Sequence, residues 1–176
     1  TWEQAAAFDP TGYYSERARD LLIGRQPFSP PSMFDAGSDR TAEQLEAETW
    51  LRATFALPAG MDLSVPGELA TEVRFIRGTE FWQLGMTGEA AAEFNSLRED
   101  AAADPVNSYR LAVYLFDLGL YRPAIMAARQ VLDLAGMNDA ATLNAPALFT
   151  HIRFGTYYPE LIVPLAQEYA FHPLFV

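Results

Sequence analysis

The chain has 176 residues, 50% of them hydrophobic and 20% charged, which suffices for one compact domain or a short solenoid and argues against low-complexity disorder. Its net charge of −11 and lack of a Lys/Arg stripe argue against nucleic acid and anionic membrane surfaces as partners. Without cysteine there is no disulfide framework, thiolate nucleophile or Cys-based zinc site, and no apolar run approaches the roughly 18 residues of a membrane span.

The first forty residues predict the end of one helix at residues 1–8, a second helix and a long connection. Asp9-Pro10 is typical of a helix start, with Asp as N-cap and Pro in the first turn. Gly24 fits the residue just after that helix. The prolines that follow predict an irregular connection over about residues 25–40. The beginning TWEQAAAFDP lacks an initiator Met and a signal peptide, and with the end at FHPLFV it predicts a fragment of a longer chain.

The next stretch predicts a helix from a capping box at residues 41–44 to about Leu57. Leu45 and Leu51, and more loosely Trp50, would point inward. After a break at residues 58–66, a further helix is predicted from about residue 67 to residue 85. Its predicted apolar stripe is formed by Leu69, Val73 and Ile76.

A doubled stretch then organises the chain. FWQLGMTGEAAAEF, beginning at Phe81, is answered by LFDLGLYRPAIMAA, beginning at Leu115. Leu84-Gly85 aligns with Leu118-Gly119, 34 residues later, and the apolar positions that follow align at the same offset. This is the period of tetratricopeptide-type hairpins, in which two helices flank a glycine-containing turn. Helices are therefore predicted at about 88–103, from Asp104-Pro105 onward, and at 122–135.

The remainder completes an all-α fold of stacked antiparallel helical hairpins, a tetratricopeptide-like superhelix. A short helix is predicted at residues 147–154, and another from Tyr158-Pro159 to Ala170, kinked or restarted at Pro164. No segment shows a convincing strand pattern. We expect residues 1–156 to form a helical-repeat scaffold region. Residues 157–176 would form a linker helix and the start of a further domain.

Residue patterns for catalysis, cofactors and metals are not found. His151 and His172 are far apart, and neither is paired with another ligand at helical spacing, so no metal site is predicted. Nucleophile elbows, Walker loops and dinucleotide fingerprints do not occur, so no catalytic residue and no cofactor is assigned. The glycine-rich segment at residues 85–88 is better explained as a hairpin turn than as a phosphate cradle, because no strand precedes it.

Four aromatic residues are candidates for contacting a ligand or a neighbouring domain. They are Trp50, Trp82, Tyr157 and Tyr158. Rings of this kind can stack on sugars or peptide stems, but packing in the core or between hairpins is the alternative at helical spacing. The pair Tyr157-Tyr158 stands in a predicted connection between domains, and is the first to test.

The C-terminal stretch YYPELIVPLAQEYAFHPLFV resembles the start of the catalytic domain in soluble lytic murein transglycosylases. The family shows a Tyr-Pro step, an apolar helix ending near Ala, a turn and a Pro-Leu pair. The residues that match are Tyr158-Pro159, Ala166, Ala170, and Pro173-Leu174 with Val176. The helical region of the family also resembles the rest of this chain, on Trp2, Asp9-Pro10, Tyr14, Arg17-Ala18 and the two Leu-Gly turns. The proline-rich connection after Gly24 departs from the family.

The resemblance implies a role in the bacterial cell wall. In such enzymes a glutamate beyond the Pro-Leu pair cleaves peptidoglycan as acid and base, and forms an anhydro-sugar product. This chain stops before the Glu-Ser motif of the family, so no catalytic residue carries over and we expect an inactive fragment. The resemblance implies an exported protein, in the periplasm, cell envelope or outside the cell, whose partners are peptidoglycan glycan strands and its own catalytic domain. A tetratricopeptide-like adaptor for proteins or peptides is the alternative, on the same 34-residue repeat.

Overall fold

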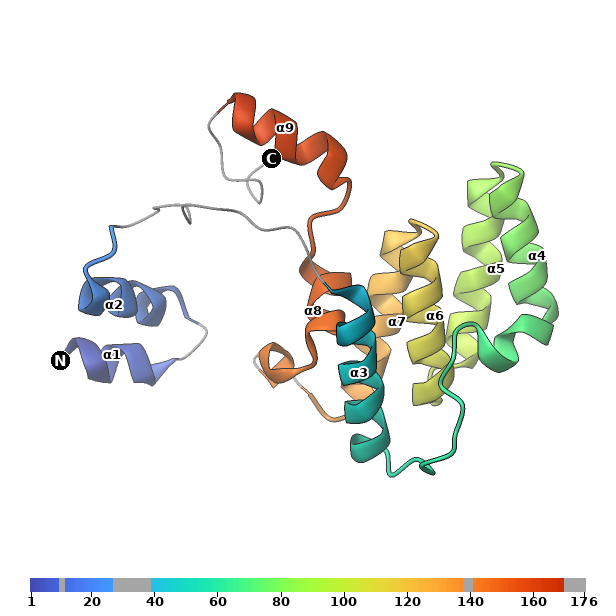
Figure 1. Cartoon of the computed structure of the whole chain (residues 1–176), viewed down its shortest axis with the longest axis horizontal. Coiled ribbons are helices and arrows are strands. Elements are labelled where there is room, and N and C mark those ends of the chain that lie inside the picture. The colour runs from blue at the N-terminus through green and yellow to red at the C-terminus, as the bar shows by residue number, and fades with distance from the viewer. Residues whose placement is uncertain (10–11, 27–38, 138–140, 170–176) are drawn as a thin grey trace. The chain divides into compact units, whose positions relative to one another are not determined.

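A computed structural model describes residues 1–9, 12–26, 39–137 and 141–169 (Figure 1). Within these ranges the chain is helical and has no strand, which confirms the predicted all-α fold. It divides into a terminal unit, residues 1–36 with 158–176, and a central unit, residues 37–157. Residues 27–38 of the predicted irregular connection and the segment 170–176, with Pro173-Leu174, lie outside the described residues.

In the terminal unit, α1 (Trp2–Phe8) and α2 (Tyr13–Ile23) form a hairpin. The Ser15 hydroxyl joins the two helices by donating to the carbonyl of Ala5 at 2.7 Å. The prediction that Asp9 caps the second helix is wrong. Gly12 occupies the N-cap position of α2, whereas Asp9 ends α1 in an extended conformation and its carbonyl accepts the Gly12 amide at 2.9 Å.

The other described helix of the terminal unit is α9 (Pro159–Glu168). It begins at the predicted Tyr-Pro step, with Tyr158 as N-cap in the left-handed region at φ 56°. Pro is tolerated in a first turn, where its missing amide would have no intrahelical partner. The helix continues through Pro164 rather than restarting there.

The central unit contains the repeated hairpins. The first pairs α4 (Val73–Gln83) with α5 (Thr87–Asp100), and the second pairs α6 (Pro105–Asp117) with α7 (Tyr121–Leu134). Gly85 and Gly119 make the two turns in the left-handed region, at φ 75° and 80°. The amides of each glycine and its successor donate to carbonyls three and five residues earlier, at 2.8 to 3.0 Å. The predicted repeat is thus two turns with the same hydrogen bonds.

The segment before the first turn differs from its prediction. Residues Gly67–Thr71 form a 3₁₀ helix, η1, and α4 begins only after Glu72, whose carboxylate accepts the Phe75 amide at 3.2 Å. Leu69 therefore lies on a different element from Val73 and Ile76, which are 66% and 44% exposed. The predicted stripe is wrong, and α4 buries Phe75 and Gly78 instead.

Aromatic rings join the two hairpins. The ring centroid of Phe75 on α4 lies 4.4 Å from that of Tyr114 on α6, and Phe94 on α5 lies 6.0 and 6.1 Å from them. A hydrogen bond of 2.8 Å links the Thr79 hydroxyl to the Tyr114 hydroxyl. Rings at these separations add to the apolar burial that holds neighbouring hairpins together.

The first helix of the central unit, α3 (Arg40–Thr54), pairs with α8 (Ala147–Phe154) and not with its neighbour in sequence. Figure 1 shows α3 and α8 on one side of α6–α7 and α4–α5 on the other. Trp50 packs on Phe149 with centroids 5.5 Å apart, and His151 Nδ1 lies 2.9 Å from a Glu43 carboxylate oxygen. A second 3₁₀ helix, η2 (Ala141–Asn144), precedes α8.

Two details of α3 differ from the prediction. The cap is Asp39, whose carboxylate accepts the Ala42 amide at 3.0 Å, and not a capping box at residues 41–44. Leu45 is 65% exposed, whereas Leu51 is fully buried in the core, so only the second of these leucines points inward as predicted. The core is continuous from α3 through both hairpins to α8.

Candidate functional site

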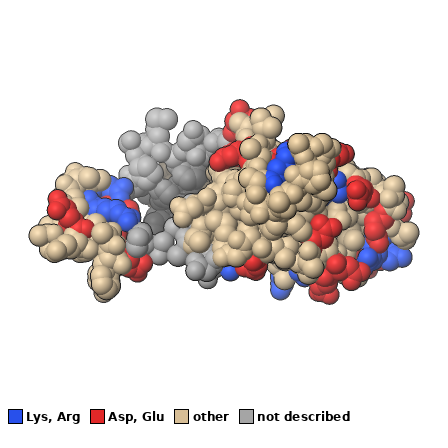
Figure 2. Space-filling view, turned by 90° about the horizontal axis from the view of Figure 1, so that it is seen from below, with Lys and Arg blue, Asp and Glu red and all other residues tan. Residues whose placement is uncertain are grey.

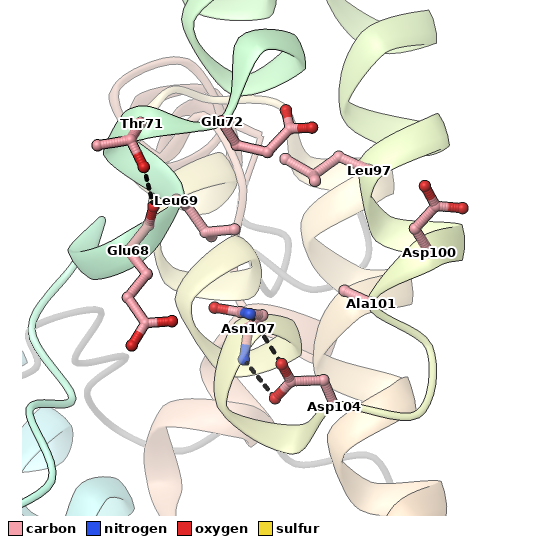
Figure 3. A pocket seen from close by; sticks show the side chains of 9 residues that line it. All are labelled: Glu68, Leu69, Thr71, Glu72, Leu97, Asp100, Ala101, Asp104 and Asn107. Carbon is pink, nitrogen blue, oxygen red and sulfur yellow. Dashed lines mark hydrogen bonds between the residues drawn. The ribbon is translucent and has the colours of Figure 1, made fainter.

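A cavity of about 630 Å³ opens where η1 meets the end of α5 and the start of α6 (Figure 3). Its apolar lining comes from three buried residues, Leu69, Leu97 and Ala101. Its polar lining is mostly acidic and consists of Glu68, Thr71, Glu72, Asp100, Asp104 and Asn107. The cavity therefore combines an apolar lining with carboxylates that favour cationic or hydrogen-bond-donating groups.

The carboxylates of Glu72 and Asp100 both bind Arg74. Glu72 accepts from Arg74 Nε at 3.0 Å, and Asp100 accepts from Arg74 Nη1 at 2.6 Å. Burial tends to raise the pKa of Glu72, but the hydrogen bonds donated by Arg74 and the Phe75 amide outweigh it and lower the pKa. Glu72 is therefore held as a carboxylate, which caps α4.

Asp104 caps α6 from the other side of the cavity. Its carboxylate accepts the amides of Val106 and Asn107 at 2.9 and 3.1 Å, and the Asn107 side-chain amide at 2.7 Å (Figure 3). Asn107 in turn accepts from Nη1 of Arg110 at 3.0 Å. These hydrogen bonds, all made by residues of α6 or its cap, hold the Asp104 and Asn107 side chains in place at the cavity.

Arg110 fastens the segment before η1. Only 3% of its surface is exposed, and Nη2 donates to the carbonyl of Asp62 at 2.7 Å. Its guanidinium occupies the space where a side chain on Gly67 would begin, with Nε 2.5 Å from an ideal Cβ. Gly67 is therefore required for this close approach. Arg110 Nε is buried without a hydrogen-bond partner in the described structure.

Three of the four carboxylates that line the cavity, those of Glu72, Asp100 and Asp104, serve in helix caps or an ion pair. A general acid needs surroundings that raise its pKa, whereas the pKa of Glu72 is lowered. Asp100 and Asp104 are engaged by an arginine and by helix amides. In the part of the chain that the structure describes, no group of three or more His, Asp or Glu side chains could hold a metal ion.

The two tryptophans singled out in the sequence lie in different places. Trp50 is half-buried on α3, with its ring centroid 6.3 Å from Phe55 and 5.5 Å from Phe149. Trp82 is half-buried on α4 and packs against the core. The α6–α7 hairpin separates the helices that carry them (Figure 1). Both make packing contacts, and they do not form one site.

The two tyrosines also differ in their surroundings. Tyr157 is half-buried in the central unit, where its hydroxyl donates to the carbonyl of Ile152 at 2.6 Å and its ring lies 4.6 Å from that of Tyr121. Burial is the main cause of a raised pKa for Tyr157. Tyr158 is 51% exposed at the start of α9, so of the four predicted residues it alone has an exposed ring.

Sequence reasoning missed the cavity. The sequence predicts a helix start at Asp104-Pro105, but nothing local places Asp104 and Asp100 next to Glu68 and Glu72. The cavity depends on the change from η1 to α4 at Glu72, where a continuous helix was predicted. The local signal that could have indicated this cap is Glu72 itself, an acidic residue placed two and three residues before Arg74 and Phe75, whose amides it accepts.

Charges of both signs are interspersed on the molecular face in Figure 2. Many described arginines are paired with carboxylates, for example Arg77 with Glu93 at 2.6 Å.

No helix in the described ranges is both long enough and apolar enough to cross a bilayer. Comparisons with protein families, curated proteins and solved structures found no match.

Proposed function

We propose that the chain is the non-catalytic helical scaffold region of a peptidoglycan lytic transglycosylase. The observation that supports a non-catalytic role is the use of carboxylates at the cavity: Glu72 and Asp104 cap helices, and Asp100 pairs with Arg74. The family itself rests on the resemblance of residues 157–176 and of the helical patterns before them, and the Tyr158-Pro159 step begins a helix. The region would position the catalytic domain and glycan strands.

A well-packed scaffold suits such a role because the role requires rigidity and no reacting groups. The central unit has one continuous core, in which residues such as Leu51, Phe94 and Phe149 are fully buried. Close-packed interiors deform little, so such a unit would offer a rigid point of attachment. Exposed carboxylates on the scaffold would keep it soluble.

The test compares the 176-residue chain with a chain extended past Val176 into the following codons of its gene. Both are incubated with purified peptidoglycan, and the soluble products are analysed for anhydro-muropeptides. We expect products from the extended chain only, and none when the glutamate of the downstream Glu-Ser motif is changed to glutamine. An extension without this motif and without activity would remove the proposal.

The second candidate is a tetratricopeptide-like adaptor that binds a protein or peptide. It is favoured by the two turns at Gly85 and Gly119, which have the same hydrogen bonds 34 residues apart. Binding of the 176-residue chain to insoluble peptidoglycan, measured by co-sedimentation, separates the two. Capture of one defined protein partner without affinity for peptidoglycan would replace the first proposal by the second.

A further inference from the structure

The two ends of the central unit contact the same aromatic ring. Arg40 is the first residue of α3, and Tyr157 is the last residue of the unit. Although they are far apart in sequence, both lie against Phe116, near the end of α6. Tyr121, at the start of α7, completes the group. We call these four residues the corner cluster.

Arg40 reaches Phe116 from α3. Its guanidinium carbon lies 5.1 Å from the ring centroid, and Nη2 donates to a carboxylate oxygen of Asp117 at 2.9 Å. A cation over an aromatic face is attracted by the ring, and the Asp117 carboxylate fixes the direction of approach. The start of α3 is thereby tied to the end of α6, which is not its neighbour in sequence.

Tyr157 reaches the same ring after α8. Its centroid lies 6.4 Å from that of Phe116 and 4.6 Å from that of Tyr121, and the Phe116 and Tyr121 centroids are 5.7 Å apart. The hydroxyl of Tyr157 donates to the carbonyl of Ile152 at 2.6 Å, which also fastens the ring to α8. The raised pKa of Tyr157, caused mainly by burial, agrees with a ring held inside this group.

We propose that the corner cluster is a clasp that couples the two ends of the central unit, so that loosening one end loosens the other. The physical reason is that Arg40 and Tyr157 share Phe116. When either contact is lost, the ring is free to shift and the remaining contact weakens. Residues that share a partner show such coupling, whereas independent sites do not.

The clasp goes beyond the proposed function and does not depend on it. It involves only residues of the central unit and needs neither a glycan ligand nor a catalytic domain. Its consequence is mechanical. The chain leaves the central unit beside Arg40 and beside Tyr157, and both of these residues contact Phe116. A pull on the chain at either place is then resisted by the corner cluster. Local unfolding next to Arg40 therefore also raises the rate of local unfolding next to Tyr157.

Hydrogen–deuterium exchange on the full 176-residue chain tests the clasp, with Phe116→Ala as the first variant. We expect about tenfold or faster exchange in two separate peptides, residues 40–47 and residues 150–157, and unchanged exchange in α5. Phe154→Ala is the matched control, since Phe154 ends α8 close to Tyr157 but is 58% exposed and packs on Arg153. The control should leave residues 40–47 unchanged.

A second variant covers the case in which Phe116→Ala loosens the whole unit. Arg40→Gln removes the cation and leaves every core residue in place. Because α3 and α8 also pair directly, with His151 Nδ1 2.9 Å from a Glu43 carboxylate oxygen, Arg40→Gln is also made in a His151→Ala background. Faster exchange at residues 150–157 in both backgrounds supports the clasp, because Arg40 then acts on them through Phe116. Faster exchange confined to residues 40–47 would overturn it, as would an equal response of residues 40–47 to Phe154→Ala.

Discussion

Gly78 on α4 lies directly against the ring of Phe94 on α5, where a Cβ atom would be 3.0 to 3.2 Å from three ring carbons. Phe94 is fully buried, so its ring has little room to withdraw. In the second hairpin the same positions are held by Ala112 and Ala128, 34 residues later in each case. A small residue facing a large ring in one hairpin thus corresponds to two alanines in the other.

We predict that Gly78→Leu destabilises the protein by about 1–3 kcal/mol, because a packed core tolerates added methylene groups poorly. Gly78→Ala should change the free energy of unfolding much less, since the helix propensity of Ala, worth about 1 kcal/mol over Gly, offsets the crowding. Urea unfolding measures both. In a Phe94→Leu background the cost of Gly78→Leu should shrink, and equal costs in both backgrounds would contradict the contact.

The pairing of α3 with α8 makes a prediction about two leucines on one helix. Leu51→Ala should lower the free energy of unfolding by about 2–5 kcal/mol, because Leu51 is fully buried. Leu45→Ala is the matched control and should change it by about 0.5 kcal/mol or less, because Leu45 is 65% exposed. Urea unfolding followed by circular dichroism gives both values. Similar small effects would mean that α3 is not part of the cooperative core.

The cap of α6 should contribute measurably to stability. Asp104→Ala removes the acceptor for the amides of Val106 and Asn107, and we expect a loss of about 1 kcal/mol. Asp104→Asn keeps an acceptor and should retain most of this. As a control, Asp133→Ala removes only an exposed pair with Arg129 and should cost about 0.5 kcal/mol or less. Thermal unfolding of the three variants ranks them, and an equal loss in all would argue against the cap.

Tyr109 should make the protein less stable at alkaline pH. Burial, and next the nearby Glu48 carboxylate, raise the pKa of Tyr109 above its ordinary value of about 10. A raised folded-state pKa gives stability that is present below pH of about 10 and is lost above it, because the unfolded chain ionises first. Unfolding free energies from pH 8 to 11 should therefore fall.

The Tyr109→Phe variant isolates this effect. The ring and its packing remain, but the titrating hydroxyl is gone, so the decline above pH of about 10 should be shallower than in the wild type. Part of the decline should remain, because burial also raises the pKa of Tyr157. Identical slopes for variant and wild type would show that Tyr109 does not carry the alkaline sensitivity.

Local sequence signals determined the helices and the repeated turn. Backbone hydrogen bonds in a helix join residues four apart, so local patterns predict which segments are helical, although the predicted caps of α2 and α3 were wrong. The turns at Gly85 and Gly119 were predicted for the same reason, because a left-handed residue after a helix favours glycine. Asp104-Pro105 was likewise placed correctly as a helix start.

Only the tertiary structure decided which helix faces are buried and which helices are neighbours. Apolar burial is not directional, so the apolar side of α3 is compatible with many surfaces, and its pairing with α8 does not follow from sequence order. For the same reason the sequence predicted both Leu45 and Leu51 inward, whereas of these two leucines only Leu51 is buried. The acidic cavity and the contacts of Arg40 and Tyr157 with Phe116 depend on these long-range choices, because they join side chains that no local hydrogen bond brings together.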